Sequence, residues 1–87
     1  MKTIGQTLQY LREAAELSGN SIAKVACISI GAYFDIERGR REASFIVIFR
    51  ICRFYEISLN EFAEMIHPEE LERRELSSLR SLAKRKL

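Results

Sequence analysis

Ser-Ile-Gly-Ala-Tyr-Phe-Asp-Ile-Glu-Arg-Gly, residues 29–39, has the pattern of one short helix with a signal at each end. Ser29 suits the N-cap because its hydroxyl can accept from an unpaired backbone N–H one turn ahead. Gly39 suits the other end, where a left-handed residue closes a helix without a Cβ penalty. Helical spacing divides the residues between them into two faces. One face holds Tyr33, Ile36 and Glu37, and the other holds Ile30, Gly31, Phe34 and Asp35.

Similar signals on both sides of this stretch predict further helices. Thr3 and Gln6 fit a capping box at the start of a helix that we expect to reach about Leu17. Ser44 is a good cap for the next apolar run, and a second capping box begins at Ser58. The expected helices are residues 4–17, 20–26, 30–38, 45–55 and one that starts at 59. Because the run 45–55 is apolar almost all round, we expect it to be central and mostly buried.

Length and charge indicate one small all-α domain. The chain has 87 residues, one Pro and four Gly, a composition that favours helices over turn-rich β structure. Its net charge is +2, and residues 1–67 are neutral, so the excess lies in residues 68–87. Pro68 suits the first turn of a helix, and a run of cations ends the chain. We therefore expect a domain at residues 1–67, followed by a C-terminal helix and basic tail at 68–87.

Several function classes lack support in this sequence. The cysteines, Cys27 and Cys52, show no metal-ligand spacing and are expected to be reduced thiols, which is typical of a cytoplasmic protein. The single histidine, His67, cannot complete a catalytic set, and a glycine-rich phosphate loop is lacking. Neither a signal peptide nor a membrane-length apolar run appears. We expect a binding module that is not an enzyme and needs no cofactor or metal.

Residues 17–62 resemble the Cro/C1-type (XRE) helix-turn-helix domain in order and spacing. The most specific piece is Ile-Glu-Arg-Gly-Arg-Arg at residues 36–41, which stands ahead of an apolar helix. The other matching pieces are Leu11-Arg12-Glu13, Leu17-Ser18, Ile22-Ala23, Ile28-Ser29, Ser44 and Ile57-Ser58-Leu59-Asn60-Glu61-Phe62. The resemblance implies a five-helix, lambda-repressor-like fold whose second and third helices bind double-stranded DNA, and a homodimer. It also implies a structural ion pair between Arg12 and Glu37, for which the alternative is a weak surface pair.

The sequence departs from this family at several positions. Gly19 stands where the family usually has a phosphate-contacting Gln, Cys27 where it has the turn glycine, and Ala43 where it has a proline. The DNA-facing side of the third helix carries Ile30, Gly31, Phe34 and Asp35 in place of the usual polar readers. None of these four can make a bidentate contact to a base, although Ile30 and Phe34 can touch thymine methyl groups.

Two interpretations of function follow. The first is a dimeric DNA-binding transcriptional regulator, a repressor of the Cro/C1 type. Its candidate DNA-binding residues are Ser29, Ile30, Gly31, Phe34, Arg38, Arg40 and Arg41. The alternative is a degenerate helix-turn-helix that binds a protein partner through Ile30 and Phe34, as an anti-repressor or co-regulator, or an antitoxin. Binding a protein partner in this way requires an exposed Phe34. The other possibility is that Phe34 folds back on its own domain. The candidate dimerisation residues are Leu76, Leu79 and Leu82.

Overall fold

The computed structural model describes residues 3–66, which form five α-helices and no β-strand. The helices are α1 (Ile4–Ala14), α2 (Gly19–Ala26), α3 (Ile30–Glu37), α4 (Phe45–Tyr55) and α5 (Leu59–Glu64). The all-α class and the order of these five helices are confirmed. The predicted C-terminal helix and tail, with the candidate dimerisation leucines, lie outside the described residues.

A Thr or Ser hydroxyl caps the start of each of these helices. The predicted capping box is present in α1, because Thr3 accepts from the Gln6 amide at 3.1 Å and Gln6 accepts from the Thr3 amide at 3.0 Å. The remaining caps are Ser18, Ser29, Ser44 and Ser58. Each cap satisfies backbone donors at the helix start and contributes about 1 kcal/mol. α1 ends earlier than predicted, since Glu16 adopts a left-handed φ of 57° and turns the chain toward α2.

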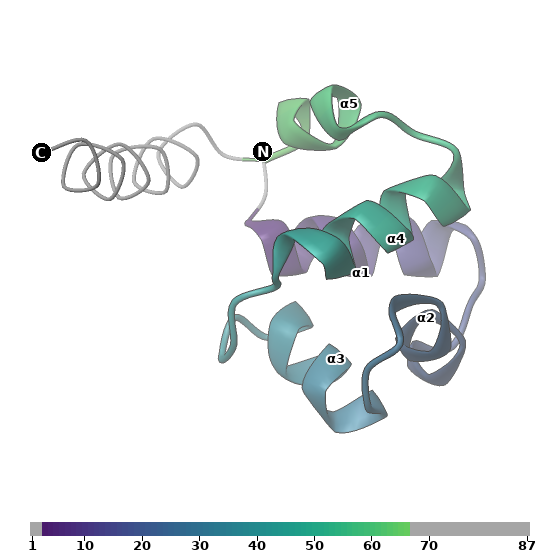
Figure 1. Cartoon of the computed structure of the whole chain (residues 1–87), viewed down its shortest axis with the longest axis vertical. Coiled ribbons are helices and arrows are strands. Elements are labelled where there is room, and N and C mark those ends of the chain that lie inside the picture. Colours follow the sequence, from purple (N-terminus) through teal and green to yellow (C-terminus); the bar gives the residue numbers. More distant parts are fainter. Residues whose placement is uncertain (1–2, 67–87) are drawn as a thin grey trace, which may run out of the picture.

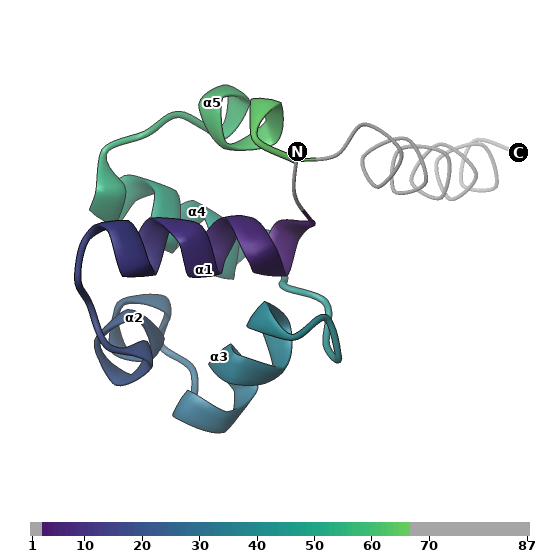
Figure 2. The same cartoon turned by 180° about the vertical axis from the view of Figure 1, so that it is seen from behind.

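The helices pack around one core. α2 packs against α3 and α4, α1 against α3, and α5 against α4. Figures 1 and 2 show α4 on one side of the domain and α1 on the opposite side, with α2 and α3 together at one end and α5 at the other. All five helices contribute side chains to the core. Its buried side chains are Leu8, Ile22, Ala23, Ala26, Tyr33, Ile36, Val47, Ile51, Cys52, Phe62 and Ile66.

The expectation that the helix 45–55 is mostly buried is wrong. The buried side chains of α4 are Val47, Ile51 and Cys52. Phe45 is 68% exposed and Ile46 is 46% exposed. The described helices pack against one side of α4 only, so the apolar residues on its other side have no cover within residues 3–66. Residues 3–66 also contain no helix long and apolar enough to cross a bilayer.

Candidate nucleic-acid interface

α2 and α3 are joined by a tight turn at residues 27–29. Cys27 caps the end of α2 in the left-handed conformation, with φ 60° and ψ 41°. Its amide bonds back to the carbonyls of Ala23 and Lys24, and the Ile28 amide also donates to the Ala23 carbonyl. Ser29 then starts α3 by accepting from the Ala32 amide at 3.1 Å. The left-handed turn therefore forms even though a cysteine occupies the position where glycine costs least.

Replacing this cysteine by glycine is expected to stabilise the domain. A left-handed L-residue is strained by about 1–2 kcal/mol, and glycine removes that strain but gains about 0.4–1 kcal/mol of unfolded-state entropy. Cys27→Gly should therefore raise the free energy of unfolding by about 0.5–1 kcal/mol. Urea denaturation measures this, with Cys27→Ala as the control that removes the thiol but keeps the strain. Equal midpoints for the two variants would mean that the strain at this turn is no larger than the unfolded-state entropy that glycine adds, and the expected gain would be absent.

α3 has one buried and one outer face, as its spacing predicts. Tyr33, Ile36 and Glu37 are buried against the domain. At the start of the outer face Ser29, Ile30 and Gly31 are exposed, and Ile30 exposes 47% of its surface. A Cβ placed on Gly31 would meet no atom within 4 Å. The first turn of α3 is thus open to a partner that approaches closely.

Phe34 does not stand out from α3 but folds back on the domain. It is partly buried, and its ring tip lies against Gly19 so closely that a Cβ at Gly19 would clash with it. The ring also lies 5.6 Å from the Arg12 guanidinium carbon and 5.2 Å from that of Arg38. The departures from the family at positions 19 and 34 are therefore coupled, because the absence of a side chain at Gly19 leaves room for the ring of Phe34. Sequence reasoning missed this role of Gly19, although two departures in neighbouring helices were visible.

The candidate phosphate-binding arginines follow α3 directly. Arg38, Arg40 and Arg41 are all exposed. Gly39 has a φ of 78°, and the Arg40 amide donates to the Asp35 carbonyl at 2.8 Å, so the chain turns sharply after the helix. This turn brings the three side chains close to one end of α3. Of the predicted DNA-binding residues, all except the partly buried Phe34 are exposed.

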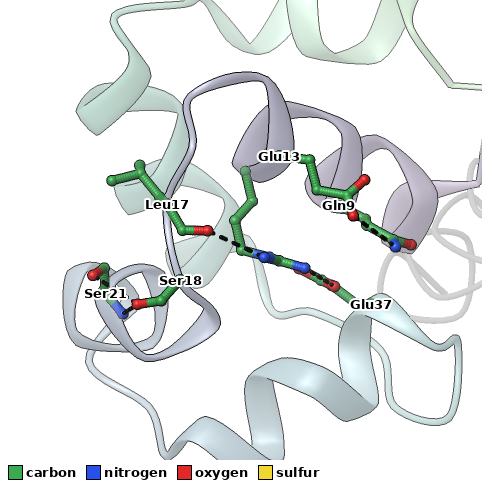
Figure 3. A network of polar contacts seen from close by, with 7 residues as sticks. Gln9, Glu13, Leu17, Ser18, Ser21 and Glu37 are labelled. Carbon is green, nitrogen blue, oxygen red and sulfur yellow. Dashed lines mark hydrogen bonds and ion pairs between the residues drawn. The ribbon is translucent and has the colours of Figure 1, made fainter.

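Arg12 and Glu37 form an ion pair that ties α1 to the end of α3. Arg12 Nε donates to Glu37 Oε2 at 2.7 Å, and Nη2 donates to Oε1 at 3.2 Å. Arg12 Nη1 also donates to the Leu17 carbonyl at 3.1 Å, and Figure 3 shows this carbonyl and Glu37 on opposite sides of the guanidinium. The side chains expose only 15% and 5% of their surface. The pair is therefore largely buried, unlike the surface pair that was the alternative.

Two tyrosines lie in the surroundings of this ion pair. Burial raises the pKa of Tyr33 well above its usual value, and burial also raises the pKa of Tyr55. Glu37 is close enough to the Tyr33 hydroxyl to raise that pKa further, yet the two groups do not meet hydrogen-bond geometry. The hydrogen bond that Arg12 donates to the Glu37 carboxylate raises the pKa of Arg12. Both tyrosines therefore stay neutral and Arg12 stays charged across physiological pH, which keeps the junction of α1 and α3 intact.

Comparisons with known proteins identify the motif. A family model described as helix-turn-helix matches residues 8–62. The restriction-modification controller protein C.AhdI from Aeromonas hydrophila is 29% identical with a TM-score of 0.62, over 68% of this chain and 89% of that protein. The clp gene regulator ClgR from Corynebacterium glutamicum is 21% identical with a TM-score of 0.66, over 97% of this chain and 85% of that protein, and shares the fold. A search among curated proteins finds no match.

The matched residues include all of α2, the turn and α3, together with the ion pair that holds α3 on α1. Residues 3–66 contain no cluster of three or more side chains able to hold a metal ion. The match extends over more than half of the chain. The chain belongs to the Cro/C1-type (XRE) helix-turn-helix family of DNA-binding transcriptional regulators.

Proposed function

We propose that this protein is a dimeric transcriptional regulator that binds duplex DNA with α3 in the major groove. The observation that carries the proposal is the open first turn of α3, where Ser29, Ile30 and Gly31 are exposed. In helix-turn-helix proteins the N-terminal residues of the second helix of the motif contact base edges. Gly31 lets the DNA approach the backbone, and Ser29 adds a hydroxyl at the helix start. Twofold operators require two such helices, which supports a homodimer.

Affinity comes mainly from phosphate contacts. Arg38, Arg40 and Arg41 are exposed cations at one end of α3, and contacts of this kind position a protein without reading sequence. Ile30 adds an apolar contact to a thymine methyl, which discriminates weakly compared with a bidentate hydrogen bond. Sequence preference therefore rests largely on DNA shape and deformability. The packed position of Phe34 supports this proposal, since Arg38 lies over its ring and is held beside α3.

The alternative of a protein-binding module has less support. It needs Ile30 and Phe34 together as exposed apolar anchors, but the ring of Phe34 packs against Gly19. Ile30 remains as a single exposed apolar residue on α3. A lone apolar side chain on a surface is ordinary and does not indicate a partner. The same argument applies to an antitoxin that would use this face.

Removing two of the arginines is expected to weaken DNA binding without changing its selectivity. In a mobility shift titrated with salt, log Kd should rise with log salt by about 0.9 per phosphate neutralised. Arg40→Ala with Arg41→Ala should lower that slope by about 3.6, because the dimer loses four phosphate contacts and each contributes about 0.9. The loss should be similar for all duplexes tested, since these residues read no bases.

The matched control for this experiment is Arg53→Ala, compared with Arg41→Ala at protein concentrations where both variants are dimers. Arg53 is also exposed, but it lies near the end of α4. Both changes remove one positive charge, so a general electrostatic effect would affect them equally. Equal slopes for the two single variants, or no binding to any duplex by the wild type, would contradict the proposed interface.

A further inference from the structure

The outer side of α4 carries an uncovered group of large apolar side chains. Phe45, Ile46 and Phe49 expose 68%, 46% and 37% of their surfaces, and we call these three residues the α4 apolar face. The rings of Phe45 and Phe49 stack with centroids 6.0 Å apart. In Figure 1 this side of the domain shows α4 in front of α1, and no described helix lies over it. A cluster of this kind on a small domain indicates a contact surface.

Positively charged side chains lie next to the α4 apolar face, toward the end of the helix. Arg50 and Arg53 follow on the same helix and are both exposed. Arg50 donates to the Ala26 carbonyl at 3.1 Å, while Arg53 makes no ion pair within residues 3–66. From its start to its end, the outer side of α4 is therefore first apolar and then basic. An occupant that fits it has apolar residues at one end and acidic residues at the other.

The sequence after Ile66 has these two features in a fixed order. Its first part, residues 68–75, is net acidic, with Glu69, Glu70, Glu72 and Glu75 against Arg73 and Arg74, and its second part carries Leu76, Leu79 and Leu82. The leucines recur every three residues, a spacing that places them along one side of a helix. As a helix, residues 68–87 would be about 30 Å long, whereas the eleven residues of α4 span about 16 Å. This segment is long enough to cover the whole outer side of α4.

We propose that residues 68–87 of a second copy of this chain bind antiparallel along α4. Leu76, Leu79 and Leu82 then contact the α4 apolar face, and the acidic part lies beside Arg50 and Arg53. The exchange is reciprocal, so a twofold axis generates two equal contacts and closes the dimer. This inference rests on the dimer of the proposed function and names the surface that receives the leucines.

The path of the chain favours exchange over folding back. Figures 1 and 2 show that α5 runs antiparallel to α4 and ends on the side of the domain where α4 begins. A segment that returned along α4 in the same chain would start with its glutamates near Phe45 and carry its leucines toward Arg53. That order puts charge against the apolar residues and apolar residues against charge. The segment of a twofold-related copy can approach from the other end of α4. Its glutamates then lie beside Arg53 and its leucines beside Phe45.

Disulfide trapping tests the contact directly. Cys27→Ser removes the exposed thiol, while the buried Cys52 stays. In this background one protein carries Phe49→Cys and another carries Leu79→Cys. Mild oxidation of the mixture should give a cross-linked heterodimer, and neither protein alone should cross-link. A dimer from Phe49→Cys alone would mean that two α4 faces meet, and this would overturn the proposal.

A chain that carries both new cysteines distinguishes the other possibilities, in which residues 68–87 cover α4 of their own chain or do not reach α4 at all. A disulfide within one chain and no dimer band would mean that the segment covers its own α4, and it would overturn the exchange. No disulfide in either format would mean that the segment does not reach α4, with the same result. Because trapping uses no DNA, cross-linking without DNA binding would contradict only the proposed function. A DNA-binding dimer without the cross-link would contradict only this inference.

Substitutions give an independent measurement by sedimentation. Phe45→Ser with Phe49→Ser should raise the dimer dissociation constant at least about thirtyfold, the loss typical of removing a central aromatic anchor. Phe54→Ser is the matched control, since Phe54 is 47% exposed on the same helix but packs edge-on against Tyr55, away from the α4 apolar face. The helical circular dichroism of both variants should equal that of the wild type. Equal dissociation constants for the two variants would overturn the proposal.

Discussion

Glu37→Ala is expected to lower the free energy of unfolding by about 3–5 kcal/mol, because it leaves the guanidinium of a largely buried Arg12 without its carboxylate. The Leu17 carbonyl would remain as the one described acceptor of that group. The loss is a large part of the 5–15 kcal/mol that typically stabilises a domain. For a chain of this size it corresponds to a fall in Tm of more than about 12 °C. Thermal denaturation followed by circular dichroism measures it.

Two further variants make the result specific to the ion pair. Glu13→Ala removes an exposed carboxylate from α1 and should change stability by less than about 0.5 kcal/mol. Arg12→Ala with Glu37→Ala should cost less than the sum of the two single changes, since the double variant buries no unpaired charge. Additive losses would show that the two residues act separately. A fall in Tm equal to that of Glu13→Ala would show that the pair contributes nothing.

Much of the fold was predictable because short-range chemistry determines it. The cap Ser29 and the buried side of α3, with Tyr33, Ile36 and Glu37, follow from neighbours within one or two turns. The candidate interface was predictable to the same extent: the first turn of α3 and the arginines after it are exposed. Spacing along one helix was enough to assign these positions to a face.

The remaining features depend on contacts between helices. Spacing along α3 does not determine whether the Phe34 ring points away from the domain or folds back on it. The ring folds back because Gly19, on α2, has no side chain and leaves room for it. Cys27 adopts the left-handed conformation because the amides of the turn bond back to α2, which outweighs its own preference. An apolar helix such as α4 gives no sign of which neighbours cover it. Only the packing of α2 and α5 on α4 shows that one side remains exposed.

Gly5 is another residue whose importance the sequence concealed, and Gly5→Ala is expected to destabilise the domain by about 3 kcal/mol. A Cβ at Gly5 would clash with the backbone carbonyls of Ile36 and Glu37 at the end of α3. Backbone atoms in a capped helix end cannot turn aside as a flexible side chain can, so α1 and α3 must move apart. The separation would also stretch the ion pair between Arg12 and Glu37. Chemical denaturation measures the loss.

Gly31→Ala is the matched control, because both glycines occupy the second position of a helix. A Cβ at Gly31 meets no atom within 4 Å, so alanine there should gain up to about 1 kcal/mol from its better helix propensity. The same substitution should therefore have opposite signs at the two positions. If Gly5→Ala were as stable as Gly31→Ala, α1 would have to lie farther from α3 than the structure places it. The 2.7 Å contact between Arg12 and Glu37 could not persist at that separation, and the case for a buried ion pair would fail with it.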